Sequence, residues 1–267
     1  MGTGIVAILL FFLPFQGKWL YYLSIIIFIF NTVLYALAAV LTILRYALYP
    51  RAWPMMMHDP VDPLYLATCP IGFATLIEMW MFICVPKWGY WATMLAWVLW
   101  MVDTAVSVVV TLMVTFLLCV YLNIFSMRYA LTLDRLCQNH TNSLDKITAV
   151  QIVPIAATIV AAGVGAEISA LLSNITYMRG TIIVSYVLWS LSMGMAMIVL
   201  AIYYQRLILH KLPPKQLAMS CFLTLGPVGF GGFGYVIMDS VEVYQANSCK
   251  QINKKNPVSW QSLTDSL

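Results

Sequence analysis

The chain has 267 residues, of which 62% are apolar and 9% are charged. Soluble domains carry about a quarter charged residues, so the composition excludes an ordinary soluble protein and indicates a membrane protein. The net charge of +4 predicts no nucleic-acid partner. The sequence has no Cys or His spacing typical of a metal site and no phosphate-binding GxxxxGK[ST] motif, so we expect neither metal nor cofactor.

Seven apolar segments are candidates for membrane-spanning helices, each of which needs about 20 apolar residues. The first of them is too short to cross a bilayer alone. We predict a transmembrane domain over residues 1–238, followed by a disordered polar tail over residues 239–267. The predicted spans cover residues 1–14, 19–44, 63–85, 88–121, 147–173, 180–205 and 216–238.

Lys and Arg predict how the spans are oriented, because these residues are enriched in cytoplasmic loops. The linkers after the even spans hold eight of them: Arg45, Arg51, Arg128, Arg135, Lys146, Arg206, Lys211 and Lys215. The linkers after the odd spans hold Lys18, Lys87 and Arg179. The odd spans are therefore predicted to run from the cytoplasm outward, and the even spans to return as partners in helical hairpins.

A motif of proline followed by small residues recurs in the third, fifth and seventh spans, beginning at Pro70, Pro154 and Pro227. A proline inside a helix removes a backbone hydrogen bond and bends the helix. The freed backbone groups cannot face lipid and must face protein or a water-filled path. The alternative is that the small residues only allow helices to pack closely. Because the motif alternates with unbroken spans, we favour a central path lined by the odd spans.

Three acidic residues lie inside predicted spans, namely Glu78, Asp103 and Glu167. Ionisable groups at membrane depth are costly and are candidates for function. Asp103 lies on an even span, so the alternative for this residue is a purely structural role. The carboxylates alone would suggest a cation path, whereas the basic cytoplasmic end and the broken helices favour an anion. The carboxylates are isolated in the sequence, which argues against an intramembrane enzyme.

Six ordered blocks of the sequence resemble the tellurite-resistance/dicarboxylate transporter family, also called the voltage-dependent anion channels. Within that family the chain is most similar to fungal sulfite efflux pumps, with malic acid transport proteins and plant guard-cell anion channels as further relatives. The blocks are MGTGIVAILL, DPLYLATCPIGFATLIEMW, ICVPKWGYWATMLAWVLWMVDTAVSV, ITAVQIVPIAATIVAAGVGAEIS, IIVSYVLWSLSMGMAMIVLAIYYQRLILHKLPP and CFLTLGPVGFGGFGY.

The resemblance implies a fold of ten transmembrane helices in five hairpins, in which kinked odd helices surround an anion pore. It also implies a homotrimer and a gating phenylalanine on the ninth helix, for which this sequence offers no counterpart. Carried over by position, the kink prolines are Pro70, Pro154 and Pro227. The predicted pore-lining residues are Gly2, Gly4, Gly72, Phe73, Gly163, Gly229, Phe230 and Gly231.

The resemblance ends near Asp239, and we therefore interpret the chain as a truncated member with about seven transmembrane helices. The expected function is sulfite efflux across the plasma membrane, with a C4-dicarboxylate such as malate as the alternative substrate. A seven-helix receptor is the alternative from a different class, but the Lys and Arg distribution places the amino terminus inside, opposite to such receptors. We expect an inorganic anion or small dicarboxylate, together with the lipid bilayer, as partners.

Overall fold

The computed structural model describes residues 2–13, 18–51, 62–130, 149–172, 174–210 and 222–255, with Pro54 and Met56 in addition. Every regular element within these residues is a helix, so the predicted all-α fold class is confirmed. The elements are α1 (Gly2–Phe12), α2 (Lys18–Leu48), η1 (Asp62–Ala67), α4 (Thr68–Ile83), α5 (Val85–Trp88), α6 (Tyr90–Ala130), η3 (Ala149–Ile152), α8 (Val153–Leu171), α9 (Ile175–His210) and α10 (Leu225–Lys255).

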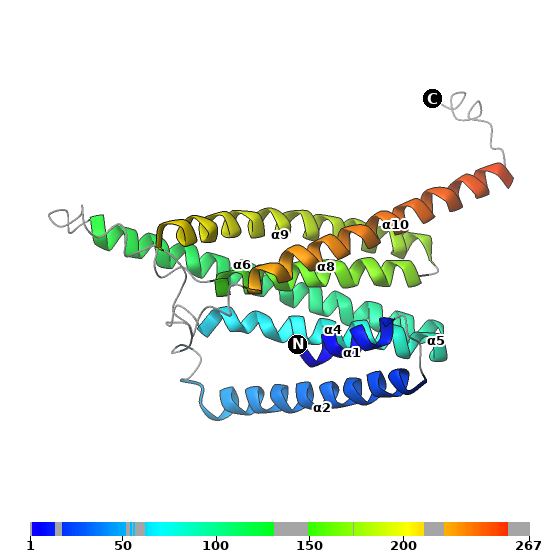
Figure 1. Cartoon of the computed structure of the whole chain (residues 1–267), viewed down its shortest axis with the longest axis horizontal. Helices are drawn as coiled ribbons and strands as arrows, with labels where there is room; N and C mark the ends of the chain where they lie inside the picture. Colours follow the sequence, from blue (N-terminus) through cyan, green and yellow to red (C-terminus); the bar gives the residue numbers. More distant parts are fainter. Residues whose placement is uncertain are drawn as a thin grey trace, which may run out of the picture.

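Successive long helices run in opposite directions and form hairpins (Figure 1). Six stretches are long and apolar enough to cross a membrane: Lys18–Leu48, Pro63–Ile83, Tyr90–Phe116, Val150–Leu171, Ile175–Gln205 and Phe222–Val241. They occupy the positions of the second to seventh predicted spans. The first predicted span is the 11-residue helix α1. The chain is thus a multi-pass membrane protein.

Four helices continue past the predicted ends of their spans, since α2 ends at Leu48, α6 at Ala130, α9 at His210 and α10 at Lys255. The prediction of a disordered tail from residue 239 is therefore wrong as far as Lys255, and residues 256–267 lie outside the described residues. The sequence from Tyr235 to Lys255 has no glycine or proline and contains several good helix formers. A helix that has already formed gains one backbone hydrogen bond with each added residue, so polarity alone does not end it.

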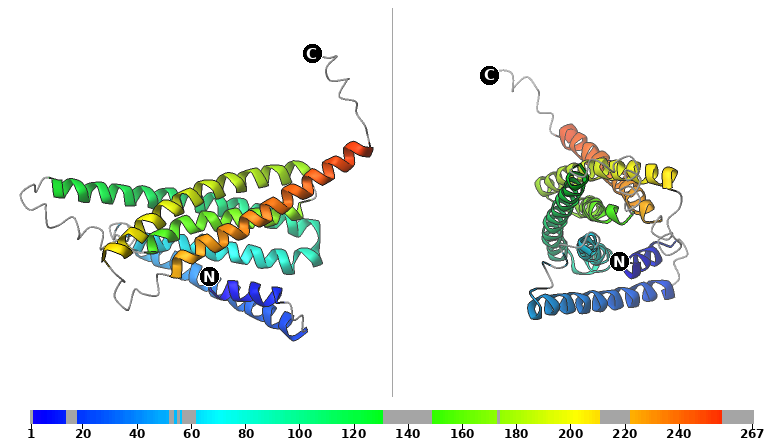
Figure 2. Two further views of the ribbon diagram at one scale, coloured as in Figure 1. Left: turned by 45° about the horizontal axis from the view of Figure 1, so that its top comes forward. Right: turned by 90° about the vertical axis from the view of Figure 1, so that its left-hand side faces the viewer.

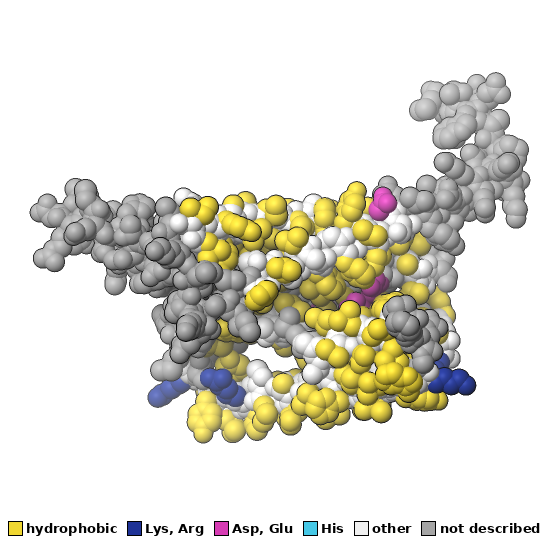
Figure 3. Space-filling view, viewed as in Figure 1, with side chains coloured by type: hydrophobic (Ala, Val, Ile, Leu, Met, Phe, Trp, Pro, Cys, Tyr) yellow, Lys and Arg dark blue, Asp and Glu magenta, His cyan; other side chains and the backbone are white. Residues whose placement is uncertain are grey.

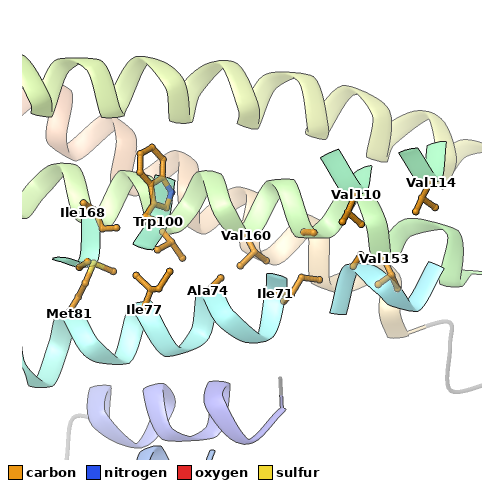
Figure 4. Close-up of a cluster of buried hydrophobic side chains, with 14 of the residues drawn as sticks. Ile71, Ala74, Ile77, Met81, Trp100, Val110, Val114, Val153, Val160 and Ile168 are labelled. Atoms are coloured by element: carbon orange, nitrogen blue, oxygen red, sulfur yellow. The ribbon is translucent and has the colours of Figure 1, made fainter. Parts of the chain in front are cut away.

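Helix α8 lies at the centre of the fold and α2, α6 and α9 lie outside it (Figure 2). In the apolar stretch that contains α8, 94% is buried inside the structure, whereas in that of α2 only 6% is buried. Figure 4 shows how apolar side chains of α4 and α8 face one another beside the Trp100 ring of α6. Trp100 is fully buried, and its Nε1 donates a 2.8 Å hydrogen bond to the Ala161 carbonyl oxygen. These contacts fix the outer helix α6 against the central helix.

The repeated prolines lie at helix starts, which corrects the prediction of kinks within helices. Pro70, Pro154 and Pro227 each occupy the first turn of an α-helix, namely α4, α8 and α10. A short 3₁₀ segment precedes each one: η1, η3 and residues 222–224. The N–H of a first-turn residue has no carbonyl partner four positions back within its own α-helix. Proline, which lacks this N–H, therefore removes no helical hydrogen bond there. The break in each odd span is thus a change from 3₁₀ to α geometry.

Candidate functional site

Helices α1, α4, α8 and α10 run in the same direction (Figure 1), and a hollow lies between α1 and the helices above it (Figure 3). Figure 3 shows acidic side-chain atoms recessed between the upper helices and α1. Glycines bring neighbouring helices close together: a Cβ on Gly4 of α1 would lie 2.6 Å from Thr75 Oγ1 of α4. A Cβ on Gly234 of α10 would lie 3.4 Å from the Gly163 Cα of α8. The sequence grouped these same helices as the odd spans.

Glu78 lies on α4 between the face that meets α1 and the face that meets α8. Its side chain is 4% exposed. The residues that contact α1 are Thr75, Met79 and Phe82. The residues on the α8 side are Ile71, Ala74, Ile77 and Met81. Because successive residues of a helix are about 100° apart, position 78 points between these faces and toward the hollow.

Glu167 has the corresponding position on α8. Val160, Val164 and Ile168 pack into the core shared with α4, whereas Gly163 faces α10. Glu167 lies between these two faces, and its buried Oε2 has no hydrogen-bond partner in the described structure. Figure 4 shows Ile168 of α8 beside Met81 of α4, and both belong to one buried cluster. Glu167 directly precedes Ile168, and Glu78 lies about one turn before Met81, so the two carboxyl groups lie at similar levels of the two packed helices. No pattern in the sequence indicates this pairing, because the residues belong to different hairpins.

An aromatic ring covers the α8 side of the same hollow, one turn before Glu167. A Cβ on Gly163 would lie 2.6 Å from Cε1 of Phe230, so only glycine leaves room for this ring in its present position. Phe230 also lies 5.6 Å from Phe233, measured between ring centroids. The structure therefore brings two of the predicted pore-lining residues, Gly163 and Phe230, to the same part of α8 as the ionisable candidate Glu167.

The other predicted glycines divide into two groups. Those with close neighbours are Gly4, Gly72 against Tyr35, and Gly231 against the Met193 sulfur, where a Cβ would be 2.5 Å away. At Gly2 and Gly229 an added Cβ would meet no atom within 4 Å, so the space beside them is open. Close helix packing, the alternative considered from the sequence, accounts for the first group.

Asp103 lies apart from the glutamates, on the side of α6 that approaches α2 and α4. It is 2% exposed, and it acts electrostatically on Tyr35, whose hydroxyl donates a 3.2 Å hydrogen bond to the Cys69 carbonyl oxygen. Its Oδ2 and the hydroxyls of Thr104 and Ser107 have no partner among the described groups. The structure therefore does not bring Asp103 to the hollow.

Two further features were missed in the sequence. Thr111 donates to the Pro154 carbonyl oxygen at 2.7 Å and lies 2.6 Å from Thr158 Oγ1, linking α6 to α8. The helical spacing of Asp103, Ser107 and Thr111 was the available signal for a polar buried face. An apolar cavity of about 290 Å³ also opens between α2, α4 and α6, and Phe73 is part of its wall. Such a cavity depends on how three helices meet, which the sequence pattern does not specify.

Comparison with known proteins identifies the family. The profile described as "Voltage-dependent anion channel" matches residues 1–255. The chain belongs to the voltage-dependent anion channel family. This confirms the family that the six sequence blocks predicted.

Curated relatives of this anion channel family member are fungal transporters. A protein named sulfite efflux pump SSU1 from Arthroderma benhamiae is 42% identical over 234 residues, which are 88% of this chain and 58% of that protein. The protein of the same name from Candida albicans is 32% identical, over 87% of this chain and 44% of its own length. A malic acid transport protein from Schizosaccharomyces pombe is 20% identical, over 88% and 50%. The chain thus spans about half the length of the curated relatives it matches.

Proposed function

We propose that the chain provides a path for small anions across the plasma membrane, and that sulfite is the transported anion. The observation that carries the proposal is the 42% identity, over 88% of this chain, to a protein named as a sulfite efflux pump. The path we propose is the hollow between α1, α4, α8 and α10, lined by Gly163, Phe230 and the two glutamates. The predicted pore-lining glycines and prolines of these helices belong to the same proposal.

Transport through such a path needs no enzymatic step. An inside-negative potential favours anion exit by about 2.3 kcal/mol per charge per 100 mV, which is about 50-fold in an equilibrium ratio. Each hairpin presents its apolar outer surface to lipid, in keeping with the exposed side chains of α2 such as Ile26 and Ile29. Assembly as a homotrimer, implied by the family resemblance, is part of the proposal.

Sulfite flux from proteoliposomes containing the purified chain tests this function. Vesicles loaded with sulfite carry a potassium gradient and valinomycin, which together set the membrane potential. We expect efflux without ATP, faster when the interior is negative. Efflux equal to that of protein-free vesicles at every potential would contradict the proposal.

A dicarboxylate is the second candidate substrate, because the Schizosaccharomyces pombe relative is named as a malic acid transport protein. Its 20% identity is about half that of the sulfite efflux pump, so we place sulfite first. Parallel vesicles loaded with malate decide between the two: faster malate than sulfite efflux at equal gradients would reverse the order. The seven-helix receptor is set aside because the chain belongs to an anion channel family.

A further inference from the structure

The hollow that we propose as an anion path contains two carboxyl groups, which on simple electrostatic grounds should oppose an anion. Glu78 of α4 and Glu167 of α8 lie at similar levels of two packed helices, and Glu167 Oε2 has no hydrogen-bond partner in the described structure. Glu78 is almost wholly buried, at 4% exposure. A pair of carboxylates in such surroundings needs either a cation or a proton, since two like charges away from bulk water repel strongly.

The basic side chains that the structure describes lie away from the two glutamates, at or near helix ends. Among them, Arg179 lies on α9, a helix that packs against α8. Because α9 packs on the Gly165 side of α8, it lies about 200° around the helix axis from Glu167. The visible face of the molecule shows the same distribution, with basic side chains confined to the ends of the apolar surface (Figure 3). These basic residues are Lys18, Arg45, Arg51, Lys87 and Arg179.

Titratable groups on the helices around the pair face elsewhere or are absent. Helix α1 has none, and α8 has only Glu167 itself. On α6, Asp103 acts on Tyr35. On α10, Tyr235 packs against Trp189 and Asp239 is exposed. Tyr186 of α9 packs beside Ala162 and Ala166 on another face of α8, and Tyr177 lies against Trp97.

We propose that Glu78 and Glu167 share one proton and act as a proton-responsive charge barrier in the anion path. This inference rests on the proposed function and assigns a regulatory element to the same hollow. With one proton the pair carries a single negative charge and anions pass. When the proton leaves to water, the pair carries two negative charges and anion passage slows.

The orientation predicted from Lys and Arg places both glutamates in the outward part of their spans. The proton therefore exchanges with the outer solution, and acid outside the cell increases efflux. A single glutamine in place of either glutamate limits the pair to one negative charge at any pH. Such a variant transports quickly even when the outer solution is alkaline.

The test varies only the external pH, with sulfite loaded at one fixed internal pH so that the internal substrate keeps its ionisation state. Proteoliposomes carry the wild type, Glu78→Gln or Glu167→Gln. The matched control is Asp239→Asn, which removes one carboxylate from the exposed surface of α10 just beyond Met238, a residue that packs near Ala166. We expect wild type and Asp239→Asn to lose at least about tenfold in rate on going from acidic to alkaline external solution, or about 1.4 kcal/mol. Both glutamine variants should stay fast throughout.

A wild-type rate that does not depend on external pH would overturn the inference while leaving the proposed function intact. Glutamine variants that keep the wild-type pH dependence would also overturn it. A spectroscopic measurement covers the remaining case, in which the wild type shows no sulfite transport. Infrared difference spectra of the purified chain should show a protonated carboxyl band that titrates in wild type and is missing in the Glu78→Gln, Glu167→Gln double variant. That band without sulfite flux would refute the proposed function and support the shared proton, whereas its absence from wild type would refute the shared proton.

Discussion

Gly165 is the position where adding a single methyl group should do most harm to the fold. A Cβ there would lie 2.5 Å from Cζ2 and 2.7 Å from Cε2 of Trp100, and in contact with Ser185 Oγ. Trp100 is fully buried, and its Nε1 is held by the Ala161 carbonyl oxygen at 2.8 Å. The ring can retreat only by giving up this hydrogen bond and disturbing the contact between α6 and α8.

The expected size of the effect follows from three contributions. Overpacking a well-filled core costs about 1–3 kcal/mol, and a buried carbonyl left without its donor costs about 1–3 kcal/mol. Alanine is favoured over glycine in a helix by about 1 kcal/mol. Gly165→Ala should therefore lower the free energy of unfolding by about 1–5 kcal/mol.

Thermal unfolding in detergent, followed by tryptophan fluorescence, measures this loss. The matched control is Gly194→Ala in α9, where no atom lies within 4 Å of the added Cβ. That variant should be as stable as wild type or slightly more stable. Equal Tm values for the two variants would show that Trp100 and Ser185 do not confine Gly165, and the proposed packing of α6 on α8 would be wrong. Adding Ser185→Ala to Gly165→Ala should recover only part of the loss, because the Trp100 ring remains.

Two further variants test the contacts around the hollow. Gly163→Ala should displace the half-buried Phe230 ring, with a smaller loss of Tm than Gly165→Ala because this ring has more room to turn; adding Phe230→Ala should restore the Tm, and no restoration would mean that another neighbour confines the site. Thr111→Val should cost about 1–3 kcal/mol in unfolding free energy, because the buried Thr158 hydroxyl loses its neighbour. In a double-mutant cycle Thr158→Val should then add little, and fully additive losses would contradict the coupling.

The sequence predicted the helices well because their signal is local. Long apolar segments, Lys and Arg in alternating linkers and six family blocks each lie within one stretch of chain. Polarity predicts the wrong end for α10, because residues 235–255 lack glycine and proline and the helix continues through them. The prolines were located correctly as a repeat, but their geometry depends on where each α-helix starts, and that boundary is among the least certain features of any sequence pattern.

The pairings within the hollow could not be predicted from sequence because they depend on how separate hairpins meet. Glu78 and Glu167 look like isolated carboxylates along the chain, yet the packing of α4 on α8 brings them to similar levels. The sequence predicts that Phe230 lines a pore. Its contact with Gly163, however, depends on how far α10 is shifted along its axis relative to α8. The residue pattern of a single helix predicts the direction in which each side chain points around the axis. It contains no information about the axial shift between two helices.

Helix phase gives two of the small residues of α8 different neighbours. Gly163 and Gly165 are two positions apart on α8, so they point about 200° apart around the helix axis. Gly163 leaves room for the Phe230 ring on the side of α10, whereas Gly165 leaves room for Trp100 of α6 and Ser185 of α9. The same short run of glycines thus lets the outer helices pack closely on one side and shapes the hollow on the other. Close packing and the proposed path are therefore compatible for this helix. A substitution at Gly165 should act mainly on stability, and one at Gly163 mainly on the position of the Phe230 ring.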